Sequence, residues 1–140
     1  MPTLVRYGAR YPYQTLAGSP FGIPRPMLGV RLIHASVIGP ELYAIVDSDA
    51  DVSTFHVNVA GLVGLDLGTC RGAATEGVGG ATPVFVCSIE LEVEGQRFVA
   101  EVHFSSAIHP TVALLGRHDV FRQFQFGFDE RGQTLLVEPY

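Results

Sequence analysis

The residues of this chain best suited to chemistry are three aspartates at alternate positions, Asp47, Asp49 and Asp51. They directly follow residues 43–46, an apolar run with β-branched and aromatic members that is too short for a helix and predicts a buried strand. An acid at the end of a strand is held by rigid backbone, as catalytic groups generally are, and carboxylates serve as general acids and bases. The spacing therefore indicates a candidate site at the turn after this strand.

Apolar periodicity predicts that β-strands surround this turn. Residues 27–38 predict a strand that a turn at 38–41 joins to the strand before the aspartates, whereas residues 54–67 allow one short helix or an irregular connection. Further strands are expected at residues 88–94, 98–104, 112–117, 124–128 and 134–138. With about eight strands and one short helix near 118–124, the expected fold class is an all-β, barrel-like domain.

The clearest hairpin has a glycine-rich turn within residues 76–81. Glycines supply the positive φ angles of tight turns, and a turn at 78–79 pairs residues whose numbers sum to 157. That register places Pro83 in a non-hydrogen-bonded pair, where its missing N–H is harmless. It also places Cys70 opposite Cys87, with Cα atoms roughly 4.5–5.5 Å apart. A disulfide is conceivable there, but in a reducing cytoplasm both cysteines are expected to remain thiols.

The composition is that of one globular domain: 140 residues, of which 47% are hydrophobic and 16% charged. The net charge of -5 speaks against nucleic acid as a partner. No segment has the pattern of a signal peptide or the roughly 18 apolar residues of a membrane span, which predicts a cytoplasmic protein without a membrane partner. Two cysteines and five scattered histidines lack metal-ligand spacing, so no metal or cofactor is expected.

Residues 1–26 predict a proline-rich, extended arm ahead of a domain that spans residues 27–140. Five prolines in the arm exclude a helix interior. Four tyrosine and phenylalanine residues imply that the arm lies against a surface, because free linkers are poor in aromatic residues. That surface is either the arm's own domain or a partner subunit.

Two other kinds of site share the alternating aspartates. Calcium-binding loops begin in this way, but they need glycine at their sixth position and glutamate at their twelfth, where this chain has Val52 and Asn58. Haloacid-dehalogenase phosphatases also place Asp-x-Asp after an apolar strand. Those enzymes are α/β proteins, whereas this sequence has almost no helical periodicity.

Three separated features resemble the retropepsin-like, or retroviral-type, aspartic proteases over roughly residues 25–140. They are the acidic turn at 47–51, the Gly-rich flap tip at 77–80 and the segment 114–117 before a short helix. The closing segment 128–134 is similar to bacterial members of that group. The family motif at the turn is Asp-Thr/Ser-Gly-Ala-Asp, so Asp49 stands where the family has glycine.

The resemblance implies roles for individual residues. Asp47 is expected to be the catalytic carboxylate, in an active-site turn completed by Ser48, Asp49 and Ala50. A structural ion pair is expected between Asp51 and Arg117. Substrate binding is expected at the flap and in the pockets around the turn, through Asp51, Val78, Gly79, Ile45, Val112 and Leu114.

The chemistry of these enzymes requires two carboxylates that share a proton, one acting as general base on water and the other as acid on the amide. The chain contains one such turn, so the pair has to come from a homodimer with the site on its two-fold axis. The expected function is hydrolysis of a peptide or protein substrate.

Asp49 provides the alternative to that function. A side chain at this position is expected to crowd the substrate, and two more carboxylates per dimer are expected to raise the proton affinity of the catalytic pair. The alternative is a catalytically impaired retropepsin fold that binds a peptide or partner without cutting it.

Overall fold

The computed structural model describes residues 4, 6–15, 22–77 and 80–140. Its regular structure is mostly β-strand, and the only α-helix in those ranges is α1 (Val57–Ala60). The all-β fold class is thereby confirmed. There are more strands than expected, because several contain only two or three residues and leave no periodicity in the sequence.

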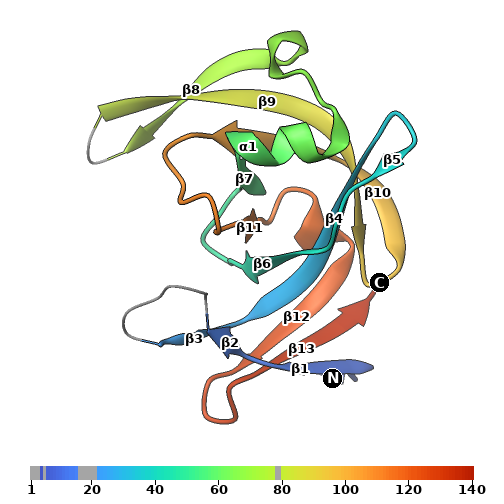
Figure 1. Cartoon of the computed structure of the whole chain (residues 1–140). Coiled ribbons are helices and arrows are strands. Elements are labelled where there is room, and N and C mark those ends of the chain that lie inside the picture. Colours follow the sequence, from blue (N-terminus) through green and yellow to red (C-terminus); the bar gives the residue numbers. More distant parts are fainter. Residues whose placement is uncertain (1–3, 5, 16–21, 78–79) are drawn as a thin grey trace.

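Six strands form a closed ring of pairings (Figure 1). In order around the ring they are β4 (Met27–His34), β6 (Leu42–Val46), β11 (Leu114–Leu115), β7 (Thr54–His56), β10 (Gln96–Ser105) and β9 (Gly80–Val93). The ring closes because β4 pairs with β6 and also with β9, so that Val30 lies between Leu42 and Val93. Two of the pairings, β11 with β6 and β7 with β10, are parallel.

The inside of the ring is filled by alternate residues of its strands. From Cys87 to Val93 on β9 and from Ala100 to Phe104 on β10 every second side chain is buried, which confirms the period of two expected there, and these residues are Cys87, Ile89, Leu91, Val93, Ala100, Val102 and Phe104. The turn between these strands is formed by Glu94 and Gly95, both with positive φ. Phe55 of β7 and Leu115 of β11 are fully buried in the same core.

The strand expected over 27–38 is interrupted. Ala35 and Ser36 adopt positive φ angles of 46° and 68°, which match the tight turns that join antiparallel strands. The chain reverses there into β5 (Val37–Ile38), which pairs back on β4. Strand β6 also pairs antiparallel with β4 and therefore continues in the direction of β5, which places the single reversal at Ala35 and Ser36 rather than at the expected 38–41.

The connection over 54–67 contains β7, α1 and a 3-10 turn, η1 (Gly61–Val63). The His56 side chain caps α1, because its Nδ1 accepts the Asn58 N–H at 3.1 Å. A second 3-10 turn, η2 (Leu67–Thr69), precedes β8 (Arg71–Gly77). Where the short C-terminal helix was expected, the chain forms only η3 (Val120–Arg122).

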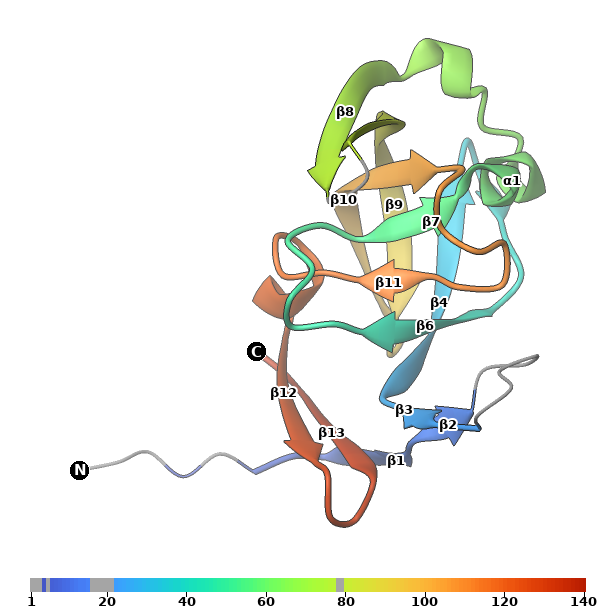
Figure 2. The same cartoon turned by 90° about the vertical axis from the view of Figure 1, so that its left-hand side faces the viewer.

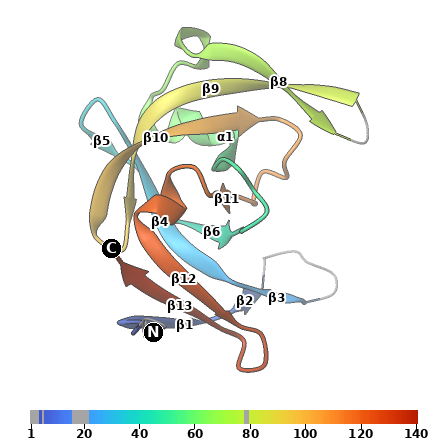
Figure 3. The same cartoon turned by 180° about the vertical axis from the view of Figure 1, so that it is seen from behind.

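Strands β8 and β9 form the predicted hairpin, which extends beyond the ring (Figure 3). Its register is confirmed, since Ala74 lies opposite Pro83 and Gly77 opposite Gly80. Cys70 and Cys87 face each other with their Cα atoms 5.1 Å apart, and they form a disulfide rather than the expected thiols. Disulfides persist in oxidising compartments, so this bond does not fit the expected cytoplasmic location.

The described part of the N-terminal arm packs on its own chain. Strand β1 (Ala9–Pro12) pairs with β13 (Thr134–Pro139), which pairs with β12 (Phe124–Asp129) in a three-stranded sheet below the ring (Figure 2). A second pairing joins β2 (Gln14–Thr15) to β3 (Pro24–Arg25).

The arm is also tied to the rest of the chain by its tyrosines. The Tyr11 hydroxyl donates to Glu94 at 2.7 Å, and this hydrogen bond, with burial, raises the pKa of Tyr11 to about 12. Burial and a hydrogen bond to Glu130 raise the pKa of Tyr13 to about 12 as well.

None of the helices in the described ranges has the length and apolar content that crossing a membrane requires.

Removing the Cys70–Cys87 disulfide should lower the free energy of unfolding by about 3 kcal/mol, because a cross-link over this short stretch restricts the unfolded chain. The bond spans a sequence separation of 17 residues. Urea unfolding with and without dithiothreitol measures the effect. The double variant Cys70→Ser, Cys87→Ser is the control and should not respond to the reductant. An unchanged midpoint of the parent protein on reduction would contradict the prediction.

Candidate active site

Asp47 begins a tight turn at the end of β6. Its backbone N–H donates to the Leu115 carbonyl at 3.0 Å, which continues the parallel pairing of β6 with β11. The Asp47 carbonyl accepts the Ala50 N–H at 3.2 Å, and its carboxylate Oδ1 accepts the Asp49 N–H at 2.9 Å. The carboxylate is therefore oriented by the backbone of its own turn, while Asp47 remains partly accessible and Ser48 and Asp49 are exposed.

Asp49, which stands where the motif of the retropepsin-like proteases has glycine, does not have a strained backbone. Among the described residues, positive φ angles occur at four non-glycine positions, and Asp49 is not one of them. Its contribution to the turn is a backbone N–H that any residue except proline could donate. The exposed Asp49 side chain thus adds a charge to the turn, while the Asp49 N–H keeps the hydrogen bond that orients Asp47.

The segment that follows β11 holds this turn from the other side. The Arg117 N–H donates to the Ala50 carbonyl at 2.9 Å, and the His118 N–H donates to the Asp51 carbonyl at 2.8 Å. We call residues 116–118 the strap. The two hydrogen bonds attach the turn to an element that is distant in sequence.

Gly116 allows the strap to approach this closely. A Cβ at this position would lie within 3.0 Å of the Val52 backbone, and backbone atoms cannot give way as a flexible side chain can. The Gly116 N–H donates to the Oγ of Ser53 at 3.0 Å, and Ser53 is only 2% exposed. In the sequence, Gly116 was noted only as part of the segment 114–117, and Ser53 was not singled out.

The structure brings together Ile45 and Leu114, two of the residues expected in substrate pockets. They are paired across the parallel strands β6 and β11, and both are half-buried. Val112 is also half-buried and lies nearby in a small cavity of about 100 Å³ with Tyr43, Val59 and other residues. Val78 and Gly79 of the expected flap tip lie outside the described residues.

The expected ion pair between Asp51 and Arg117 does not form. Among the described residues, side-chain ion pairs of 4.0 Å or less join only Arg71 to Glu101 and Arg97 to Glu92. Asp51 and Arg117 do line one cavity, and their segments are joined through backbone hydrogen bonds instead. The side chains are therefore neighbours without neutralising each other in a direct pair.

Phe85 is an exposed apolar residue of the hairpin that the sequence analysis did not single out. It has the same parity on β9 as the core residues Cys87 and Ile89, yet it is 38% exposed because it lies where the hairpin leaves the ring. Its hairpin partner Gly72 leaves space on that face, since a Cβ there would meet no atom within 4 Å. Extending the alternation of β9 backwards from residue 88 would have found this apolar position.

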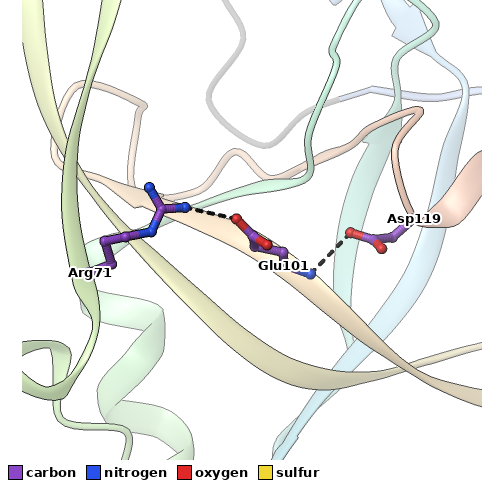
Figure 4. Close-up of polar contacts among 3 residues, drawn as sticks. All are labelled: Arg71, Glu101 and Asp119. Atoms are coloured by element: carbon purple, nitrogen blue, oxygen red, sulfur yellow. Dashed lines mark hydrogen bonds and ion pairs between the residues drawn. The ribbon is translucent and has the colours of Figure 1, made fainter.

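Polar contacts connect the base of the hairpin with the region of the strap (Figure 4). Arg71 of β8 pairs with Glu101 of β10 at 2.9 Å, and the Glu101 N–H donates to Asp119 Oδ2 at 3.0 Å. The Arg71–Glu101 pair is exposed to solvent, so it adds little stability. Burial lowers the pKa of the neighbouring His103, against the opposing effect of Glu101 and with a further lowering by Arg71.

Two other observations concern cavities and possible metal sites elsewhere in the described residues. A separate cavity of about 280 Å³ lies between the arm and the ring, and none of the predicted site residues lines it. In the described ranges no three His, Cys, Asp or Glu side chains converge in a way that could hold a metal ion, and this includes the three aspartates of the turn.

Gly116→Ala should destabilise the protein by more than about 2 kcal/mol, because the added methyl group forces the strap away from Val52. Gly72→Ala is a matched control, since its Cβ would meet no atom within 4 Å, and it should change stability by less than about 1 kcal/mol. Chemical denaturation of both variants measures the difference. Equal stabilities would show that the close approach is not a constraint.

Comparison with protein-family models and with curated protein sequences finds no match for the chain.

Proposed function

We propose that two copies of this chain form an aspartic endopeptidase of the retropepsin type. The observation that carries the proposal is the Asp47 carboxylate, which lies at the end of a ring strand and accepts a hydrogen bond from its own turn. The strap, which follows a parallel partner strand, supports that turn through two further hydrogen bonds. A carboxylate held in this way suits general acid and base catalysis, because its position does not depend on a mobile loop.

In the proposed mechanism, the two Asp47 carboxylates of a dimer lie roughly 3 Å apart and share one proton, because both cannot ionise at that distance. The ionised carboxylate takes a proton from a water molecule while the water oxygen attacks the peptide carbonyl carbon. The protonated carboxyl then donates its proton to the amide nitrogen as the C–N bond breaks. The products are a carboxylic acid and an amine, with no covalent intermediate on the enzyme.

The proposed mechanism predicts homodimer formation, because one chain supplies a single Asp47. Multi-angle light scattering at micromolar concentration should give twice the chain mass of 15.1 kDa. A chain that stays monomeric up to high concentration would rule out the shared carboxylate pair and with it this mechanism.

A second candidate function rests on Asp49. Its side chain is exposed on the turn and places two more carboxylates near the catalytic pair of a dimer. A protein that uses the same aspartate turn to hold a peptide or partner without cutting it is consistent with that charge. The two candidates differ in whether peptide bonds are broken, so a cleavage assay separates them.

Asp47→Asn should abolish peptide cleavage and leave the dimer intact, because an amide cannot act as the general base. Asp49→Gly should increase cleavage, or create it, because it removes a bulky and charged side chain from beside the catalytic pair. A peptide-library assay with detection by mass spectrometry, at acid and neutral pH, measures the cleavage by both variants.

The control is Asp47→Asn in the Asp49→Gly background, which should also be inactive. Cleavage that persists without Asp47 would assign the activity to another source. Cleavage that stays the same or falls in Asp49→Gly would show that Asp49 is harmless or used by the enzyme.

A further inference from the structure

A cavity of about 650 Å³ opens beside the aspartate turn, on the side of the strap. Its lining combines positively charged, apolar and acidic side chains, namely Asp51, Val52, Arg117, His118, Phe121 and Arg122. We call it the strap cavity. Asp51 is four residues from Asp47, so the cavity adjoins the candidate active site directly.

The walls of the strap cavity are fixed by contacts within the fold. On one side, the backbone hydrogen bonds at 2.9 and 2.8 Å hold Arg117 and His118 against the turn. On the other side, the Phe121 ring packs on Phe126 with centroids 4.7 Å apart, and Val120, the first residue of η3, is completely buried. The charged side chains therefore project from a rigid frame.

The charge of the strap cavity opposes that of the chain. The whole chain carries a net charge of -5, whereas this cavity contains two guanidinium groups and one carboxylate. Across the described ranges, neither Arg117 nor Arg122 has an acidic partner within 4.0 Å. A guanidinium presents a planar fork of N–H donors whose geometry matches the two oxygens of a carboxylate.

We infer that the strap cavity is a subsite for a carboxylate of the bound peptide. This inference rests on the proposed function, from which the peptide ligand is taken. The substrate class that it implies is acidic peptides. Arg117 and Arg122 would hold the carboxylate, and the half-buried Phe121 ring would contact the methylene groups that carry it. Asp51 opposes the binding and limits its strength. The carboxylate can belong to a glutamate side chain or to the C-terminus of the peptide.

The test uses the full chain with Asp47→Asn, so that binding is measured without cleavage. Calorimetry compares a C-terminally amidated peptide that contains glutamate with the same peptide containing glutamine. The glutamate peptide should bind about tenfold more tightly, as expected for a charge-assisted hydrogen bond. A third peptide, with glutamine and a free C-terminus, distinguishes the C-terminal carboxylate from the side chain.

Variants of the lining residues should change the preference for the glutamate peptide in opposite directions. Arg122→Gln or Arg117→Gln should remove the preference for glutamate, whereas Asp51→Asn should increase it. Arg131→Gln is the matched control, since Arg131 is exposed in the turn between β12 and β13 and does not line the strap cavity. Circular dichroism of each variant checks that the fold is retained.

Titration with N-acetylglutamate separates this inference from the proposed function. In NMR spectra it should shift the backbone amide signals of residues 117–122, and N-acetylglutamine amide, which carries no carboxylate, should not. If these shifts occur but no peptide is cleaved by the unmodified chain, the protease proposal fails and the carboxylate site stands. The inference is overturned if N-acetylglutamate causes no shifts. It is also overturned if Arg122→Gln and Arg131→Gln show the same preference for the glutamate peptide over the glutamine peptide.

Discussion

The contact between Gly116 and the Val52 backbone is the constraint on which the arrangement of the site depends. It brings the strap close enough to the aspartate turn for hydrogen bonds from Arg117 and His118 to the carbonyls of Ala50 and Asp51. Ser53 belongs to the same contact, because its buried hydroxyl accepts the Gly116 N–H that would otherwise lack a partner. A larger residue at 116 would separate the strap from the aspartate turn, two segments that are distant in sequence and are held together by these contacts.

The closed ring explains how short strands can support a rigid site. Strand β11 has two residues and β7 has three, which alone would give few ladder hydrogen bonds. Each is bonded on both edges inside a closed ring, and the bonds continue beyond the strand ends, from Ile45 to Ala113 and from His103 to Ser53. Because the ring leaves these central strands without free edges, their positions are determined by both neighbours.

The parts of the fold that were predictable from the sequence are those set by local pattern. The register of the β8–β9 hairpin followed from its glycines and Pro83, and strands β9 and β10 followed from strict alternation. By contrast, β7 was missed, because three residues show no period. The interruption at Ala35 and Ser36 was missed because neither residue favours positive φ. The aspartate turn was located correctly, but its partner Gly116 and the open Asp51–Arg117 pair depend on contacts between distant segments.

The hairpin that carries Phe85 is bonded very unequally along its length. Among the described residues, strand β8 pairs with β9 alone, whereas β9 is flanked by β10 only from Val84 onward. Opening the outer hairpin therefore breaks no bond of the ring, so it requires less free energy than global unfolding, and its amides should exchange hydrogen sooner than those of the core. The covalent link between Cys70 and Cys87 limits how far such an opening can spread. The fold thus contains a small cooperative unit that can separate from the rest and return without disturbing Asp47.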